Sequence, residues 1–395
     1  MRSWLRFSIS LVYPAATMTA PARINADVLL WARERARLTI EQLAKGVHAK
    51  PEQVMAWEVG EAFPTFRQAQ HLAATAHVPF GFLFLPKPPQ EKLPLPDLRT
   101  VGGEAVSEPS VDLLDTVRAV LQKQAWYIEY LKESGHAPLA FVGSHSLQSP
   151  VRSVVADMVR VLKIGEGTRH GSWEDYQRSL IAAADNAGIL VMRSGMVGNN
   201  THRKLDVAEF RGFAVADKWA PVVFINSADA PSARLFTFVH ELAHLWIGSS
   251  GISNQSTTTS RREEQFCNAV AGEFLVPEHS FLDLWDGALD WRANVARLPG
   301  IYHVSKLVIA RRALDLGFID AQTHRDFYLQ ELEAYRRGKK SGGSSYRTAK
   351  AKNGQRFSLA ILSEALSGRM LLRDAGRLLG VQPAKIGVYA KEFKL

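Results

Sequence analysis

The segment FTFVHELAHLWIG, residues 236–248, has the residue types and the spacing of a metal-binding site. His240 and His244 are four residues apart, so on a helix both imidazoles lie on one face, about one turn apart. Neutral imidazole is a good zinc ligand, and Glu241 stands beside the first ligand, where a general base for the attacking water is expected. The pattern predicts two Zn²⁺ ligands and a catalytic carboxylate. The alternative interpretation is a pair of capped surface histidines.

Two glutamates in the next predicted helix, within STTTSRREEQFCNAVAGEFLVP, compete for the position of third ligand. Ser260 and Glu263 have the spacing of a capping box, which gives Glu263 a structural task. Glu264 has no such task and lies on the same helix face as Asn268, four residues later. We therefore predict that Glu264 is the third ligand and that Asn268 orients a histidine ligand through its other ring nitrogen. Glu273, nine residues beyond Glu264, is the less favoured ligand.

Three short apolar segments precede this motif and are bounded by Gly, Asn, Asp or Pro: residues 188–195, 209–217 and 220–226. This pattern is typical of β-strands. The last segment contains PVVFIN, and we expect it to form an edge strand beside the metal, where an extended substrate could pair with it by β-augmentation.

The helix that carries the motif has recognisable start and stop signals. Asp229 is the expected N-cap, Pro231 suits the first turn, and Gly248 suits the C-terminal stop. Further along the chain, Tyr302 and His303 are candidates for stabilising the transition state, with Arg211 and His279 as further candidates.

The segments EFRGFAVADKWAPVVFIN, FTFVHELAHLWIG and EEQFCNAVAGEFLVP together resemble the ImmA/IrrE family of metallopeptidases, over about residues 185–320. The resemblance implies a zincin-like (gluzincin) fold and a zinc endopeptidase that removes a transcriptional repressor, as in the induction of mobile elements or in stress responses. In that family the metal-binding glutamate precedes an asparagine by four residues, which matches Glu264 and Asn268.

Residues 24–90 have the pattern of an all-α bundle, and LTIEQLAKGVHAKPEQVMAWEVGEAFPT resembles the helix-turn-helix of the XRE (Cro/C1-type) repressor family. Thr39 and Gln42 form a predicted capping box, and a helix is expected to begin at Pro51. Lys50 and Gln53 are the candidates for contacts with DNA, although the glutamates of the same helix would meet phosphates unfavourably. The alternative is a docking module for a helix-turn-helix partner protein.

The length and composition set limits on the class of protein. A chain of 395 residues is long enough for two or three domains. It is 46% hydrophobic and 22% charged, and no apolar run approaches the roughly 18 to 20 residues of a membrane helix. A single cysteine, Cys267, excludes an intrachain disulfide and favours a cytoplasmic location. Residues 1–20 form an N-terminal extension with the outline of a secretory signal, and Met18 is an equally good start.

The remaining boundaries follow from Pro, Gly, Ser and charge. Residues 91–110 are a Pro-rich linker, 111–337 a helical region with the peptidase-like domain, and 338–345 a flexible linker. Residues 346–395 form a basic helical tail: between 331 and 395 there are fourteen Lys or Arg against five Asp or Glu. The tail has the outline of a second helix-turn-helix, which suggests nucleic acid, and the alternative is that it covers the peptidase domain.

The sequence thus predicts a mostly helical α+β protein: a zinc endopeptidase in transcriptional regulation that cleaves or displaces a repressor protein. The expected substrate or partner is a repressor of helix-turn-helix type, or a toxin; contact with DNA and a homodimer are further expectations. Two alternatives stay open. One is a DNA-binding regulator or antitoxin with a structural or inactive metal site, and the other is a general peptidase for short peptides.

Overall fold

A computed structural model describes residues 21–91, 93–95, 109–165, 168–253, 262–337 and 345–395. The contacts divide the chain into two units, Met1–Lys92 and Leu93–Leu395, and each is considered by itself. The chain is mostly helical with one small mixed sheet, in agreement with the α+β prediction. The predicted extension 1–20 and most of the two predicted linkers lie outside the described residues. In the described part, no helix is long and apolar enough to cross a membrane.

The first unit is a small bundle of helices, and its elements are α1 (Ala26–Arg35), α2 (Ile40–Val47), α3 (Pro51–Glu58), α4 (Phe66–Thr75) and the 3-10 helix η1 (Phe80–Phe84). The start of α2 is the predicted capping box: Thr39 Oγ1 accepts from the backbone N–H of Gln42, and Gln42 Oε1 accepts from that of Thr39. Apolar side chains from the helices, including Leu43 and Trp57, form one buried core.

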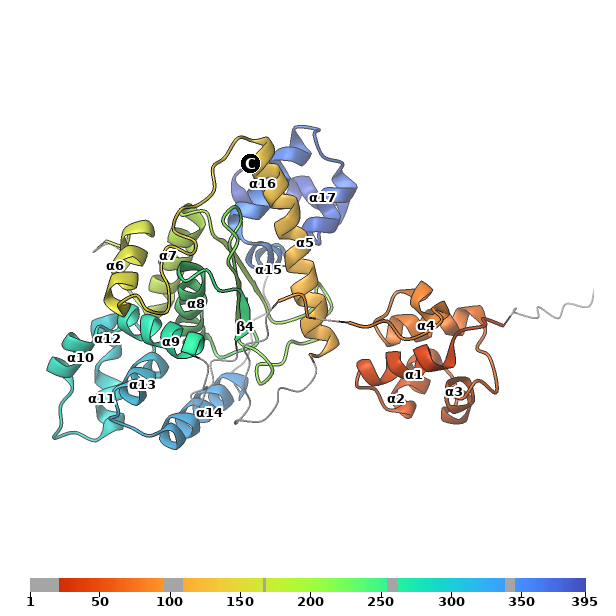
Figure 1. Cartoon of the computed structure of the whole chain (residues 1–395), viewed down its shortest axis with the longest axis horizontal. Helices are drawn as coiled ribbons and strands as arrows, with labels where there is room; N and C mark the ends of the chain where they lie inside the picture. Colours follow the sequence, from red (N-terminus) through yellow and green to blue (C-terminus); the bar gives the residue numbers. More distant parts are fainter. Residues whose placement is uncertain (1–20, 92, 96–108, 166–167, 254–261, 338–344) are drawn as a thin grey trace, which may run out of the picture. The chain divides into compact units, whose positions relative to one another are not determined.

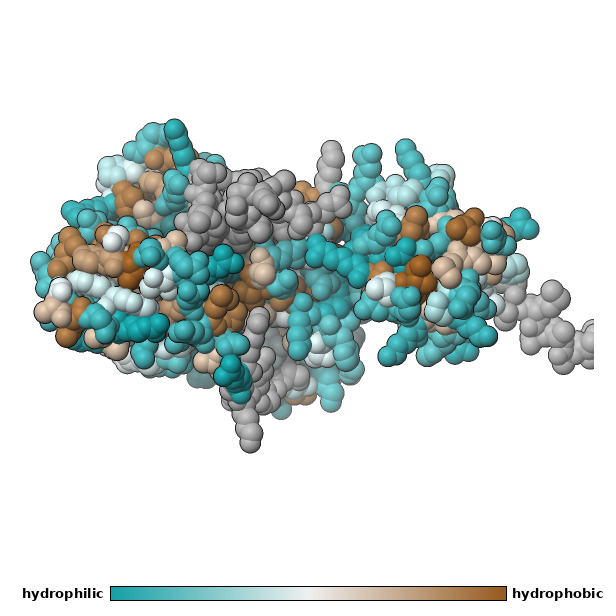
Figure 2. Space-filling model, turned by 90° about the horizontal axis from the view of Figure 1, so that it is seen from below, coloured by the Kyte–Doolittle hydropathy of each residue, from teal (hydrophilic) through white to brown (hydrophobic). Residues whose placement is uncertain are grey.

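A mostly buried ion pair and several exposed apolar side chains lie at or near α3 in this unit. The Arg33 guanidinium donates two hydrogen bonds to the Glu58 carboxylate, at 2.7 and 3.0 Å. Met55, Val59 and Phe63 are 45%, 67% and 47% exposed, and apolar surface is visible among the polar side chains of this unit in Figure 2. The surface near α3 is therefore less acidic and more apolar than its sequence alone indicates.

The second unit is built around a four-stranded sheet with strands β1 (Leu190–Ser194), β2 (Gly212–Val215), β3 (Val222–Asn226) and β4 (Gly251–Ser253). Their order is β1-β3-β2-β4; β1 pairs with β3 in parallel, and the other two pairs are antiparallel. Each predicted segment contains one of the first three strands. The prediction that PVVFIN is an edge strand is wrong, because β3 lies between β1 and β2. The strands at the two edges are β1 and β4, and β4 was not predicted.

The strands alternate their side chains between two cores, as expected for a sheet that is covered on both faces. Val191, Val223 and Ile225 belong to one apolar cluster. Leu190, Met192 and Phe224 belong to the other. The sheet is therefore the middle layer of this unit.

Helices from the centre of the chain form the apolar cluster on the first face, some packed directly on the strands and others packed on those helices (Figure 1). They are α6 (Val151–Val161), α7 (Trp173–Asn186), α8 (Pro231–Trp246), α9 (Arg262–Leu275), α10 (Glu278–Leu284), α11 (Trp291–Arg297), α12 (Pro299–Tyr302), α13 (Lys306–Asp315) and α14 (Ala321–Arg337). Helix α8 packs against β2, β3, α9 and α13, so every one of its residues from Leu235 onward is buried, as expected for a helix that is apolar on several sides.

The second face is covered by α5 (Val111–Glu133) and by the predicted basic tail. The tail contains α15 (Ser345–Asn353), α16 (Gln355–Leu366), α17 (Leu372–Leu379), η3 (Pro383–Lys385), α18 (Ile386–Ala390) and η4 (Lys391–Phe393). Ser345, predicted as the end of a linker, begins α15. Helices α15 and α16 contact β1, and the Asn353 side chain donates to the carbonyl of Leu379 at 2.8 Å. The tail is thus a layer of the second unit.

Candidate metal centre

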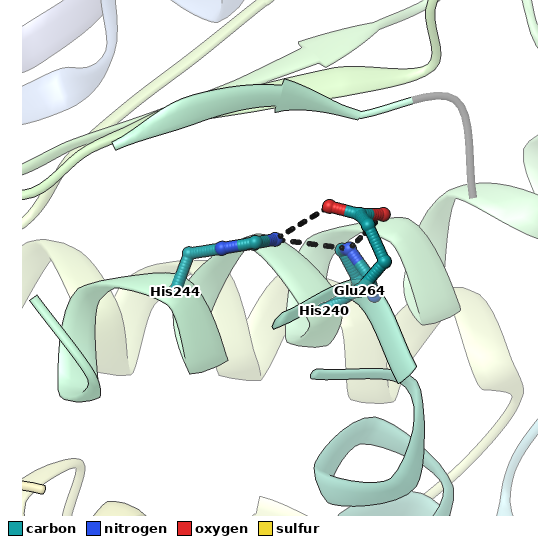
Figure 3. Close-up of side chains that lie close together, drawn as sticks. All are labelled: His240, His244 and Glu264. Carbon is teal, nitrogen blue, oxygen red and sulfur yellow. Dashed lines mark hydrogen bonds and ion pairs between the residues drawn. The ribbon is translucent and has the colours of Figure 1, made fainter. Parts of the chain in front are cut away.

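Two neighbouring helices bring His240, His244 and Glu264 together (Figure 3). Helix α8 begins at Pro231. Proline suits the first turn of a helix because the backbone N–H that it lacks would have no partner within the helix. It ends before Gly248, whose φ of +68° is the left-handed conformation that favours glycine. The predicted Asp229 cap is wrong: the N-cap is Ala230, and the Asp229 carboxylate instead accepts from the Tyr328 hydroxyl at 2.7 Å.

The distances among the three side chains fit a tetrahedral metal ion. The Nε2 atoms of His240 and His244 are 3.2 Å apart, His240 Nε2 is 3.4 Å from Glu264 Oε2, and His244 Nε2 is 3.2 Å from Glu264 Oε1. Zinc ligands at about 2.05 Å in tetrahedral geometry are about 3.3 Å from one another. Each of these three distances is within about 0.1 Å of that spacing, and each histidine faces its own oxygen of Glu264.

Burial and hydrogen bonding also fit a cation. His240 and His244 are fully buried and Glu264 is 1% exposed, yet neither oxygen of Glu264 has a well-formed hydrogen bond to any described residue. Buried carboxylates normally have partners, because an unpaired one loses its hydration without compensation. Burial lowers the pKa of His240, which keeps its imidazole in the neutral form that binds metals. Burial alone would raise the pKa of Glu264, but the two histidines outweigh it and lower that pKa to about 2.

Glu241 lies next to this triangle and is held by the sheet. The Ser253 hydroxyl in β4 donates to Glu241 Oε1 at 3.0 Å, while the buried Oε2 has no partner in the described part of the chain. Gly212 in β2 allows this close approach, because a Cβ there would be 2.7 Å from Glu241 Oε1 and 2.9 Å from the Phe224 carbonyl. Burial, and after it the Glu264 carboxylate, raises the pKa of Glu241 well above its usual range. One oxygen is therefore anchored and the other is available for proton transfer.

The predicted role of Asn268 does not appear in the hydrogen bonding. Asn268 is buried one turn after Glu264, but within the described ranges its Oδ1 has no hydrogen-bond partner, and neither does Nδ1 of His240 or His244. The predicted hydrogen bond from Asn268 to a histidine is therefore absent. Glu273, the less favoured ligand, is paired elsewhere: its carboxylate accepts from Arg312 and from the backbone N–H of Glu278.

Tyr302 and His303, two of the four candidates for transition-state stabilisation, have other partners. The Tyr302 hydroxyl hydrogen-bonds to the Ser280 hydroxyl at 2.9 Å, and His303 Nδ1 lies 2.6 Å from the Gly171 carbonyl. Neither is part of the group formed by His240, His244 and Glu264.

Lys50 and Gln53, the candidates for DNA contacts, lie at the start of α3 in the first unit and are both exposed. Gln53 Oε1 accepts from the backbone N–H of Lys50 at 3.0 Å, so this amide oxygen caps its own helix. Ser260 lies outside the described residues, so its predicted capping box with Glu263 stays a prediction.

A cationic and aromatic group lies beside the first half of α8, and sequence reasoning named only Arg211 among its members. Arg211 stacks over the Tyr328 ring, with 4.2 Å from Cζ to the ring centroid, and Arg311 lies 5.0 Å from the centroid of Phe236, one turn before His240. His324 shares this small cavity, and burial, Arg311 and Arg211 lower its pKa to about 3. The only signal in the sequence is the four-residue spacing of His324 and Tyr328.

Family comparison covers part of the second unit. Residues 184–314 match the peptidase M78 family, described as the IrrE N-terminal-like domain. This span includes all four strands, α8 and α9, and it supports the ImmA/IrrE assignment for that region. Residues 353–392 match a domain of unknown function, DUF8813. Comparison with curated proteins and with solved structures finds no significant match.

Proposed function

We propose that this protein is a zinc-dependent endopeptidase that regulates transcription by cleaving a repressor protein. One observation carries the proposal. His240, His244 and Glu264 lie close enough to share a metal ion, and Glu241 beside them has one carboxyl oxygen with a hydrogen-bond donor and one without. A purely structural zinc site is closed by four protein ligands and has no use for a positioned base. The peptidase family match over residues 184–314 supports the same reaction class.

The role that we assign to each side chain follows from its contacts. His240, His244 and Glu264 would hold the ion, and a bound Zn²⁺ would supply Lewis-acid chemistry, polarising the scissile carbonyl and lowering the pKa of water. Ser253 fixes Oε1 of Glu241. The free Oε2 accepts a proton from the attacking water and passes it to the leaving amine.

The substrate would bind in an extended conformation along β4. This strand pairs with β2 on one side, and no other described strand pairs with it. An added peptide strand would satisfy its outward backbone groups. Because Ser253 of β4 contacts Glu241 at 3.0 Å, such a peptide would pass close to the base.

The first unit would deliver the peptidase to its target by binding protein. Met55 and Val59 are exposed apolar side chains on or just after α3, and the Glu58 carboxylate is neutralised by Arg33. An exposed apolar helix face favours a protein partner over the phosphates and base edges of DNA. The expected partner is a helix-turn-helix repressor. A toxin, a DNA site and a second copy of the chain are the alternatives.

The decisive experiment compares the wild type with Glu241→Gln in host cells and as purified full-length protein. The variant keeps the shape of the side chain but removes the base, so we expect unchanged zinc content and complete loss of cleavage. New protein N-termini, quantified by mass spectrometry, should appear in a DNA-binding repressor only with the wild type. Identical N-termini in both strains, with zinc bound in both proteins, would favour the regulator or antitoxin with a structural metal. Cleavage of unrelated short peptides without sequence preference would favour the general peptidase.

A further inference from the structure

The second unit contains a cavity of about 500 Å³ on the side of the sheet away from the metal ligands. Three segments line it: the loop after β1, helix α15, and the turn between α17 and η3. The loop belongs to the span that matches the peptidase family, whereas the turn belongs to the span that matches the domain of unknown function. Its volume lies within the range of about 300 to 1,000 Å³ that is usual for small-molecule sites.

A set of close polar contacts builds one wall of this cavity. Lys352 Nζ donates to Asn199 Oδ1 at 2.5 Å, and Asn199 Nδ2 donates to the Gly380 carbonyl at 2.8 Å. Gly380 has a φ of +66°, and a Cβ there would be 2.7 Å from Lys352 Nζ. This left-handed conformation favours glycine, and the absence of a side chain lets the turn close over the lysine.

The charges around the cavity are of one sign. Lys352 and Lys385 are its charged lining residues, and no Asp or Glu side chain among the described residues lines it. In the same part of the chain, neither lysine has a carboxylate within ion-pair distance. Burial lowers the pKa of Lys352. A partly buried ammonium group without a counter-ion would be stabilised by an anionic ligand.

The rest of the lining suits a ligand with an apolar or aromatic body. Tyr346 supplies an aromatic ring, while Met196 and Val381 supply apolar surface. Asn199 and other neutral polar groups can orient polar substituents. A free inorganic ion would use the cations and leave this remaining volume unfilled.

We propose that this cavity binds a phosphorylated small molecule of about the size of a mononucleotide, with its phosphate at Lys352 and Lys385 and its ring against Tyr346. Such a ligand would contact both the loop after β1 and the C-terminal helices, and would hold these two parts of the unit together. The site is separate from the metal centre and does not depend on the proposed peptidase function.

The test measures ligand binding to the full-length protein by calorimetry and by thermal unfolding. The probes are the four mononucleotides, a set of sugar phosphates, adenosine and inorganic phosphate. We expect at least one phosphorylated probe to bind with a dissociation constant below about 1 mM and to raise the unfolding temperature. Adenosine and inorganic phosphate alone should bind at least about tenfold more weakly, because each fills only one part of the cavity.

Substitutions locate the site. Lys385→Met, on an exposed turn, and Lys352→Met should each weaken binding of that probe by about tenfold, as expected for the loss of a charged contact to phosphate. The matched control is Lys391→Met, an exposed lysine that does not line the cavity, and it should change affinity less than twofold. Lys352 also donates to Asn199, so Lys352→Met changes the polar contacts that form one wall of the cavity. Lys385→Met removes a charge without changing those contacts. Absence of binding by every phosphorylated probe, equal binding of adenosine, or equal effects of the control variant would overturn the proposal.

Discussion

Replacing Gly212 with alanine tests whether β2 positions the base. The added methyl group would be 2.7 Å from Glu241 Oε1, 2.9 Å from the Phe224 carbonyl oxygen and 3.0 Å from Glu241 Cγ. Ordinary van der Waals contact begins at 3.4 Å, so the carboxylate must retreat by about 0.7 Å. The Phe224 oxygen belongs to the neighbouring strand and yields less easily than a side chain. Moving Glu241 relieves its own contacts with the methyl group, while the contact with the Phe224 oxygen strains the pairing of β2 with β3.

We expect an effect on both catalysis and stability. A displacement of that size stretches or breaks the 3.0 Å hydrogen bond from Ser253 and moves Oε2 from its position. Misplacing a reacting group by about 1 Å can cost about 100-fold in rate, so we expect kcat to fall by roughly that factor. Overpacking should cost about 1 to 3 kcal/mol of stability. The zinc content should be unchanged, because the close neighbours of the added methyl group include none of the three ligands.

The assay measures kcat on the repressor or on a peptide from its cleavage site, zinc by mass spectrometry, and stability by urea unfolding. Gly300→Ala is the matched control in the same unit, because no described atom lies within 4 Å of the point that its methyl group would occupy. It should leave all three quantities near those of the wild type. Full activity of Gly212→Ala with normal zinc content would refute the idea that contact with β2 positions Glu241.

Three further predictions use the same measurements. Glu264→Ala should lose zinc. Glu263 is partly exposed, so Glu263→Ala should keep zinc and lower the stability by about 1 kcal/mol. The reverse result would make Glu263 the third ligand. Ser253→Ala should retain zinc but lower kcat by about tenfold, because Glu241 Oε1 loses its donor; unchanged kcat would show that the anchor is dispensable. Burial and the nearby Lys352 lower the pKa of Lys123 to about 7. Between about pH 7 and 10 the unfolded chain therefore binds a proton at Lys123 that the folded chain does not bind. The free energy of unfolding should rise with pH in this range. Lys123→Met should flatten this rise in urea unfolding at about pH 7, 8 and 9, and parallel profiles would contradict it.

The sequence predicts the chemistry of the centre better than its surroundings, because the chemistry depends on local spacing. The four-residue separation of His240 and His244 places both on one helix face wherever that helix packs. The choice of Glu264 over Glu263 rests on the predicted capping box of Ser260 with Glu263 and on the four-residue spacing of Glu264 and Asn268. In the structure Glu264 is buried beside α8, while Glu263 is partly exposed. The relative positions of such residues can be predicted from the sequence because the residues lie within one helix.

The features that sequence reasoning missed depend on contacts between distant segments. Strand β4 contains only Gly251, Ile252 and Ser253 and has too few residues for an alternation pattern. The central position of β3 follows from the pairing order of the strands, which no single strand encodes. The predicted second helix-turn-helix has its apolar residues buried, but helical periodicity does not reveal that α15 and α16 pack on the sheet.

That cover over β1 has a consequence during protein synthesis. Ser345, where α15 begins, follows the end of β1 at Ser194 by about 150 residues. At the usual rate of about 5 to 20 residues per second, the ribosome needs roughly 10 to 30 seconds to make that stretch. During this time Leu190 and Met192 lack the helices that later bury them. During that time the apolar side chains of β1 on this face are accessible to chaperones, and a product cut short before residue 345 would leave them without the cover of α15 and α16.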